Sequence, residues 1–179
     1  MLKKILIGLA VIIVGLLVVV AVQPSQFQVT RTATIAAPPP AVFEQVNDLH
    51  HWQAWSLWGK IDPAMKETFA GAPAGVGAIY TWSGNSQVGE GRMTITESRP
   101  SDLIRLKLEF IRPFAGLCAV EFSFKPEGDQ TAVAWSMDGK NNFIAKAVGL
   151  FVSCDKMIGG QFEQGLAQMK ALVETANKK

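Results

Sequence analysis

The chain of 179 residues is 49% hydrophobic, which suits one domain of ordinary size with its own core, and it contains no internal repeat. Of its 17 basic residues, Lys3 and Lys4 stand before an apolar segment, and the remaining 15 are balanced by 15 acidic residues. A neutral body lacks the basic surface that nucleic-acid-binding proteins need, so we exclude that class.

The apolar run from Ile5 to Val22 is the first element. At a rise of about 1.5 Å per residue it makes a helix of roughly 27 Å, close to the thickness of a bilayer's hydrocarbon core. The lysines before it favour a cytoplasmic N-terminus, which predicts a single-pass anchor in a bacterial inner (cytoplasmic) membrane, with the body on the periplasmic or extracellular side. A cleaved signal peptide is the alternative, because Val19 and Ala21 fit a cleavage site.

The sequence therefore divides into residues 1–26, an anchor with a short linker, and residues 27–179, a single domain. Only Gln23 to Gln26 separate the anchor from the first strand, so we expect the domain to lie within roughly 15 Å of the lipid surface.

The domain opens with an alternating strand, Phe27–Ile35, in which Arg31 is an exception on the apolar face. Three prolines end this strand, and they favour a short helix at Ala41–Asn47, followed by a helical turn at Asp48–Ala54. Six further segments predict strands from their alternation and from the turn residues between them: Met65–Phe69, Ala78–Ser83, Val88–Glu97, Leu103–Ile111, Ala119–Lys125 and Thr131–Asp138.

The last element is a long amphipathic helix, Asp155–Asn177, with Asp155 as its expected N-cap. An open antiparallel sheet needs a cover for one face, and this helix is the expected cover. The nearly apolar segment Asn142–Val152 before it packs either as part of this closing arrangement or as a lid that touches lipid. The helix presents one apolar stripe, formed by Ile158, Phe162, Leu166, Met169, Leu172 and Val173.

Besides this order of elements, five short motifs are informative: Pro39–Phe43, Trp52–Trp58, Tyr80–Asn85, Val88–Gly91 and Phe162–Leu166. Together these features resemble the polyketide cyclase/dehydrase branch of the START-like, or SRPBCC, superfamily, over about Phe27 to Ala176. The resemblance implies an α+β helix-grip fold, in which a curved seven-stranded antiparallel sheet wraps around the C-terminal helix. In relatives the enclosed cavity takes lipids, sterols, hormones or polyketides, and members differ in what they do with it.

Aromatic residues are the main candidates for ligand binding, since the chain has five tryptophans and ten phenylalanines. A groove lined by large rings suits a flat or acyl ligand, whereas the same rings packed together form an ordinary solid core. The residues expected to line such a groove are Tyr80, Trp82, Phe110, Phe122, Trp135 and Phe162.

Polar candidates are few. Glu90 and Arg92 share one face of a predicted strand, and they form either a surface ion pair or a polar hook at the cavity mouth. His50 and His51 titrate near neutral pH, but no nucleophile motif accompanies them, and adjacent histidines in a helical turn cannot both face one site. We therefore assign no catalytic residue.

The cysteine and histidine content gives no zinc spacing, and we expect neither a metal nor a cofactor. Cys118 and Cys154 are expected as buried thiols, with a disulfide as the alternative if the domain lies outside the cytoplasm.

Three functions follow from these features. The first, which the anchor and the aromatic face favour, is membrane-anchored binding of a hydrophobic small molecule or lipid. The second is a cyclase- or hydrolase-type enzyme that positions a water with Glu90, Arg92 or a histidine. The third is an envelope interaction module with a filled core and an exposed patch at Trp52, Trp55 and Trp58. The sequence names no ligand, protein partner or oligomeric state.

Overall fold

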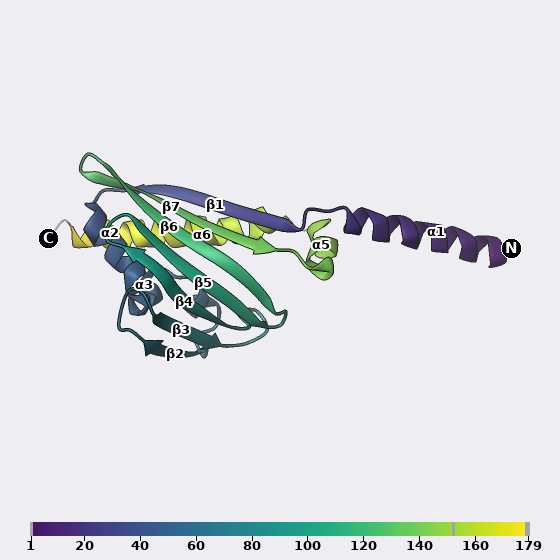
Figure 1. The fold of residues 1–179 in the computed structure, drawn as a ribbon, viewed down its shortest axis with the longest axis horizontal. Helices are drawn as coiled ribbons and strands as arrows, with labels where there is room; N and C mark the ends of the chain where they lie inside the picture. Colours follow the sequence, from purple (N-terminus) through teal and green to yellow (C-terminus); the bar gives the residue numbers. More distant parts are fainter. Residues whose placement is uncertain (1, 152, 178–179) are drawn as a thin grey trace.

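Helix α1 (Leu2–Ala21) projects as a rod from one end of an α+β body (Figure 1). The computed structural model describes residues 2–151 and 153–177. Within these residues α1 is the one helix long and apolar enough to cross a membrane, and only 6% of its apolar window is buried. Its length and composition suit either a membrane anchor or a signal sequence.

Seven antiparallel strands form one sheet in the order β1-β7-β6-β5-β4-β3-β2. The first strand lies at one edge because it pairs with the last, and the remaining strands follow one another as hairpins. The strands are β1 (Gln26–Ile35), β2 (Lys66–Gly71), β3 (Ala78–Ser83), β4 (Glu90–Arg99), β5 (Leu103–Arg112), β6 (Gly116–Glu127) and β7 (Gln130–Lys140).

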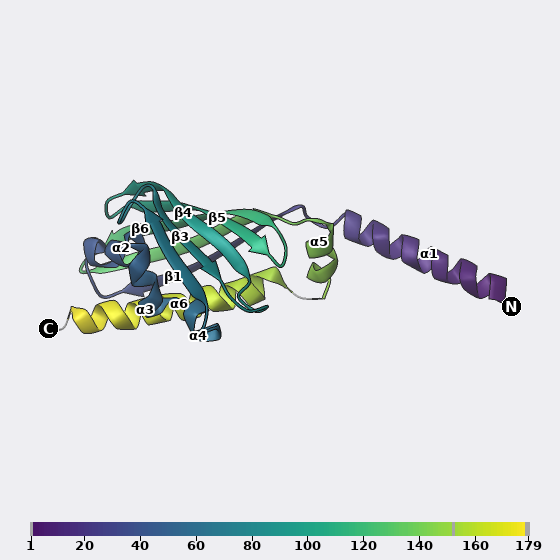
Figure 2. The same cartoon turned by 90° about the horizontal axis from the view of Figure 1, so that it is seen from below.

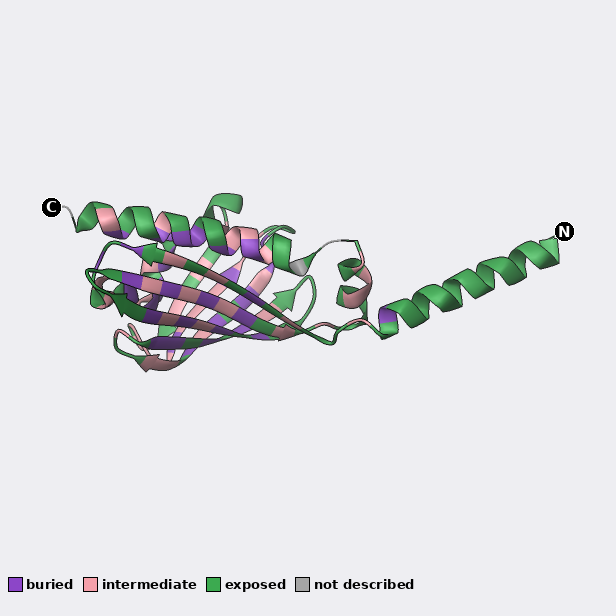
Figure 3. Ribbon diagram, turned by 90° about the horizontal axis from the view of Figure 1, so that it is seen from above, coloured by how far each residue is buried: buried purple, intermediate pink, exposed green. Residues whose placement is uncertain are grey.

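Helix α6 (Cys154–Ala176) runs along the concave face of this sheet, and Figure 2 shows it lying across the strands. Its buried positions lie on the side that faces the sheet, and burial alternates along the central strands (Figure 3). The α+β helix-grip fold is therefore confirmed. Four members of the predicted stripe are buried and Ile158 is half-buried, but Leu172 is exposed and lies off the stripe.

The expected N-cap of α6 is wrong. The hydroxyl of Ser153 accepts the capping hydrogen bond from the Lys156 amide, and α6 begins at Cys154. Asp155 instead pairs with Arg31 of β1, 2.9 Å away. Asp155 lies two residues after the N-cap and faces the Arg31 guanidinium. It therefore forms charge-assisted hydrogen bonds with this group rather than a hydrogen bond with the helix end.

The connection from β1 to β2 is helical: α2 (Pro39–Asn47), η1 (Leu49–His51), α3 (Trp52–Trp55) and α4 (Trp58–Ile61). The last of these was not predicted. Trp52 and Trp55 are only 5% and 0% exposed, and their indole N–H groups donate to the carbonyls of Val46 and Gln45. The interaction-module hypothesis predicted an exposed patch of tryptophans here, and that prediction is wrong.

Helix α5 (Phe143–Gly149) is a separate element between β7 and α6, and Asn142 caps it by accepting from the Ala145 amide. None of its residues is buried, so the prediction that this segment packs as part of the closing helix arrangement is wrong. Figures 1 and 2 both place α5 beside the end of α1. Val152, the last residue of the predicted segment, lies outside the described residues.

Candidate ligand-binding site

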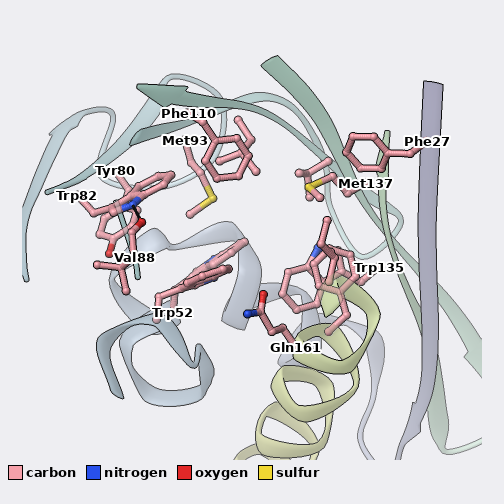
Figure 4. Close-up of a pocket in the computed structure, with 15 residues that line it drawn as sticks. Phe27, Trp52, Tyr80, Trp82, Val88, Met93, Phe110, Trp135, Met137 and Gln161 are labelled. Carbon is pink, nitrogen blue, oxygen red and sulfur yellow. Dashed lines mark hydrogen bonds between the residues drawn. The ribbon is translucent and has the colours of Figure 1, made fainter. Parts of the chain in front are cut away.

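A cavity of about 140 Å³ lies between the concave face of the sheet and α6 (Figure 4). Its walls come from the sheet, from the helical connection between β1 and β2, and from α6. Gln161 is the one lining residue that is neither aliphatic, sulfur-containing nor aromatic. An apolar cavity of roughly 150 Å³ is known to hold benzene, so this space matches a single ring or a short acyl segment.

Five of the aromatic residues expected from the sequence line this cavity: Tyr80, Trp82, Phe110, Trp135 and Phe162. Strand geometry explains their convergence, because residues two apart on one strand point to the same face. Tyr80 and Trp82 on β3 are such a pair, and their rings lie 5.9 Å apart.

Gly91 leaves space for the indole of Trp82. It lies directly opposite Trp82 in the β3–β4 register, and a Cβ at this position would overlap the indole ring. The Trp82 N–H donates to the Val88 carbonyl at 3.1 Å, which fixes the ring against the end of the hairpin.

Trp135 stands at the centre of an aromatic stack. Its ring lies 3.8 Å from that of Phe162 at an angle of 10°, and 4.8 Å from that of Phe122. Phe122 is fully buried and does not line the cavity, unlike its neighbours in the predicted groove. It packs against Trp135, so its contribution to the cavity is to hold that ring in place.

Glu90 and Arg92 lie outside the lining, and they do not pair with each other. Glu90 accepts a hydrogen bond from the Arg112 guanidinium at 2.6 Å. Arg112 lies opposite Glu90 on β5, so Glu90 pairs with this cross-strand neighbour instead of with Arg92, two positions along its own strand. Arg92 is exposed.

The two histidines also lie away from the cavity. The His50 ring is 2.7 Å from the Asp48 carboxylate and stacks on Phe69, and His51 contacts the Glu44 carbonyl. The residues through which the enzyme hypothesis would position a water therefore do not converge on the cavity.

Tyr80 brings one acidic neighbour that the sequence did not suggest. Its hydroxyl donates to the Glu67 carboxylate at 2.6 Å, and Gln53 donates to the other oxygen of the same carboxylate. Burial, followed by this hydrogen bond, raises the pKa of Tyr80 above its ordinary value of 10.0. The phenol is therefore protonated at neutral pH, and its proton is engaged.

Two polar groups of the lining make no hydrogen bond among the described residues. The Trp135 indole nitrogen is buried without a partner. The Gln161 carboxamide extends from α6 into the space between Trp52 and Trp135 (Figure 4), also without a partner. Sequence reasoning missed Gln161, although it directly precedes the predicted Phe162.

Further lining residues were also missed. Phe27, Trp52 and Met93 lie on the concave side, and the alternation of β1 and β4 contains the signal for Phe27 and Met93.

Cys118 is buried on β6, whereas the side chain of Cys154 lies outside those described, so the thiol and disulfide alternatives stay predictions.

Residues 26–174 match the model of the family described as polyketide cyclase/dehydrase and lipid transport. A search of curated proteins found no match. Among solved structures, protein CV1439 from Chromobacterium violaceum is 18% identical with a TM-score of 0.58, covering 84% of this chain and 99% of its own.

The Aha1 dimer from Colwellia psychrerythraea is 12% identical with a TM-score of 0.59, covering 83% of this chain and 96% of its own. Ara h 8.0201 is 10% identical with a TM-score of 0.54, covering 84% and 97%. At these identities the structures show a common fold, and the family match covers nearly the whole body. The chain belongs to the polyketide cyclase/dehydrase and lipid transport family, a branch of the SRPBCC superfamily whose helix-grip fold is typical of hydrophobic-ligand binding.

Proposed function

We propose that the domain binds a small hydrophobic molecule or one end of a lipid in the cavity, while α1 keeps it at the membrane. The observation that carries this proposal is the lining, in which rings and aliphatic side chains surround a space of about 140 Å³ beneath α6. Each Å² of apolar ligand surface that moves from water into such a space contributes about 25 cal/mol of favourable free energy to binding.

The polarity of the lining supports a further property of the ligand. The unpaired Trp135 N–H and the Gln161 carboxamide both lie in an otherwise apolar environment. A buried donor without a partner costs about 1–3 kcal/mol, and a ligand acceptor would recover part of this free energy. The preferred ligand is therefore an apolar body with one hydrogen-bond acceptor, such as a carbonyl oxygen.

The competing functions have less support. Glu90, Arg92 and the two histidines lie outside the lining, so no specific observation favours a cyclase- or hydrolase-type reaction. The buried tryptophans and the cavity beneath α6 both run against a solid interaction module.

Acetophenone and ethylbenzene test the proposal, since they have similar shape and only the former carries a carbonyl. We expect the full chain in detergent to bind acetophenone about three- to tenfold more tightly, in line with one hydrogen bond. The measurement is a titration followed by the indole ¹⁵N–H signals, in which the Trp135 signal should shift.

Trp135→Phe should remove this preference while retaining binding of both compounds. Trp58→Phe is the matched control, because Trp58 also lines the cavity, and it should keep the preference. Failure of both compounds to bind would reject the proposed function, and equal affinity in the unmodified protein would reject the acceptor.

A further inference from the structure

Exposed apolar side chains gather at the end of the body that adjoins α1. They lie on the β5–β6 hairpin, on and just after α5, and near the start of α6, and they are 46–85% exposed. We call this set the apolar rim: Ile111, Phe114, Leu117, Phe143, Ile144, Val148, Phe151 and Met157.

Strand register brings these segments together. Cys118 near the start of β6 pairs with Gly139 near the end of β7, and β7 leads directly into α5. Gln26 at the start of β1 pairs with Lys140 at the end of β7, so the linker from α1 arrives at the same end. Figures 1 and 2 agree on this arrangement.

Exposed apolar side chains are more concentrated at this rim than elsewhere on the described body. Elsewhere in the described body, comparably exposed large apolar side chains are Ile61, Val76 and Leu172, which lie on three separate segments. Single exposed apolar residues are normal on protein surfaces, whereas a contiguous group marks an interaction site.

The position of α1 identifies the occupant. Lys146 of α5 donates to the Ala21 carbonyl at the end of α1 at 3.3 Å, and the Asn141 amide donates to the Ser25 carbonyl in the linker at 3.0 Å. The α5 part of the rim therefore lies beside the point where α1 ends, and the β5–β6 hairpin lies at the same end of the body. If α1 crosses a bilayer, this is the depth of the lipid headgroups and the first acyl carbons.

The charges around the rim agree with a lipid surface. Lys140 and Lys156 are exposed at this end and, like the exposed Asp138 on β7, form no ion pair among the described residues, while Glu90 is paired with Arg112. Apolar and aromatic residues fringed by lysines are typical of segments that lie in the membrane interface and contact anionic lipids.

We propose that the apolar rim docks into the surface of the bilayer that α1 crosses, so that this end of the cavity faces lipid. The proposal rests on the proposed anchoring by α1. Phe27, Phe110 and Ile158 bound the cavity at this end, and each is partly exposed. A ligand then enters from the bilayer rather than from water, which assigns the cavity a class of molecules that dissolve in membranes.

Depth-dependent quenching tests the docking. The full chain, with Cys118→Ala and Cys154→Ala, receives a single bimane-labelled cysteine and is reconstituted in phosphatidylcholine–phosphatidylglycerol vesicles containing lipid with a doxyl group near the headgroup. We expect labels at Phe114→Cys and Ile144→Cys to be quenched about twofold or more, as for side chains that lie within the interface.

Two controls define the alternatives. Ser86→Cys lies in the β3–β4 turn at the same end of the sheet and tests proximity alone, and Asp129→Cys lies in the β6–β7 turn at the far end. Both should be quenched far less. Rim labels quenched no more than Ser86→Cys would overturn the docking, as would equal quenching of all four.

Loading provides a second readout. A Phe114→Glu/Phe151→Glu variant should take up 4-hexylacetophenone from vesicles several-fold more slowly, yet bind acetophenone added in water with unchanged affinity. Equal uptake rates would overturn entry from the bilayer. Quenched rim labels in a protein that binds neither compound would reject the cavity function and leave the docking intact, and the reverse result would reject the docking alone.

Discussion

Arg31 shows how one residue can break a pattern for a tertiary reason. It lies on the apolar face of β1, where its guanidinium reaches across to α6 and pairs with Asp155 at 2.9 Å and Glu163 at 2.5 Å. A Cβ at Gly159 would overlap this guanidinium, whereas a Cβ at Gly160 would meet no atom within 4 Å. The two adjacent glycines of α6 therefore have different roles.

Alanine substitution separates these roles. Gly160→Ala should raise the free energy of unfolding by about 1 kcal/mol, since alanine favours the helix by that amount over glycine. Gly159→Ala gains the same propensity but displaces Arg31 from both carboxylates, so its net stability should be lower than that of Gly160→Ala. Urea unfolding followed by circular dichroism measures both, and equal stabilisation would contradict the assigned role of Gly159.

At the scale of elements, α6 is fastened to the β1 edge at both ends. Arg31 holds its first turns, and near its C-terminus Lys170 donates to the Thr34 carbonyl at 2.7 Å while the Ala36 amide donates to Glu174 at 2.8 Å. These contacts close the edge of the grip beside the cavity. They also make the attachment of the α6 N-terminus dependent on charge.

Acid should loosen the first of these attachments. The hydrogen bond from Arg31 lowers the pKa of Asp155 below its ordinary value of 3.8. A depressed pKa in the folded state means that the unfolded state binds the proton more readily, so this contribution to stability is present above about pH 4 and is lost as pH falls through the folded pKa.

Stability measured by urea unfolding should therefore decline more steeply between about pH 5 and pH 2 in the unmodified chain than in Arg31→Met, which lacks the guanidinium. Thr30→Val, on the neighbouring outward position of β1, serves as the control and should keep the steeper decline. Parallel pH profiles for the unmodified chain and Arg31→Met would exclude the ion pair as a source of acid sensitivity.

At the scale of the whole molecule, α1 stands apart from the body, and its contacts run to α5 and the linker. This separation is compatible with a helix that crosses a bilayer and a grip that stays outside it. We expect the protein to be retained as a single-pass membrane protein with the body on the periplasmic or extracellular side.

Expression in a bacterium tests this expectation. The full chain should resist extraction by alkaline carbonate, and its intact mass should include residues 1–26. Protease added to the outer side of the inner membrane should digest the body. Val14→Lys should weaken membrane retention, because a lysine at the centre of a spanning helix costs about 2.5–3.5 kcal/mol. A soluble mature protein that lacks the apolar helix would establish a cleaved signal sequence instead.

Local patterns account for most of the fold that was predicted. The alternation of β3 places Tyr80 and Trp82 on one face, and helical spacing places Phe162 and Leu166 on another, without any knowledge of the partners. Each of these features depends only on residues a few positions apart. The strands, the long helix and the apolar helix α1 were accordingly predictable, with their ends shifted by a few residues.

The details of the site depend on which segments meet. Phe122 and Trp135 carry the same apolar signal and lie opposite each other in the β6–β7 register, yet only Trp135 lines the cavity. Glu90 pairs with Arg112 rather than with Arg92 because β4 pairs with β5. Asp155 pairs with Arg31 and does not cap the helix. The sequence by itself determined the elements and their apolar faces, since these follow from local periodicity. The tertiary structure alone decided which rings enclose the cavity and which charges pair, since both depend on contacts between residues far apart in the chain.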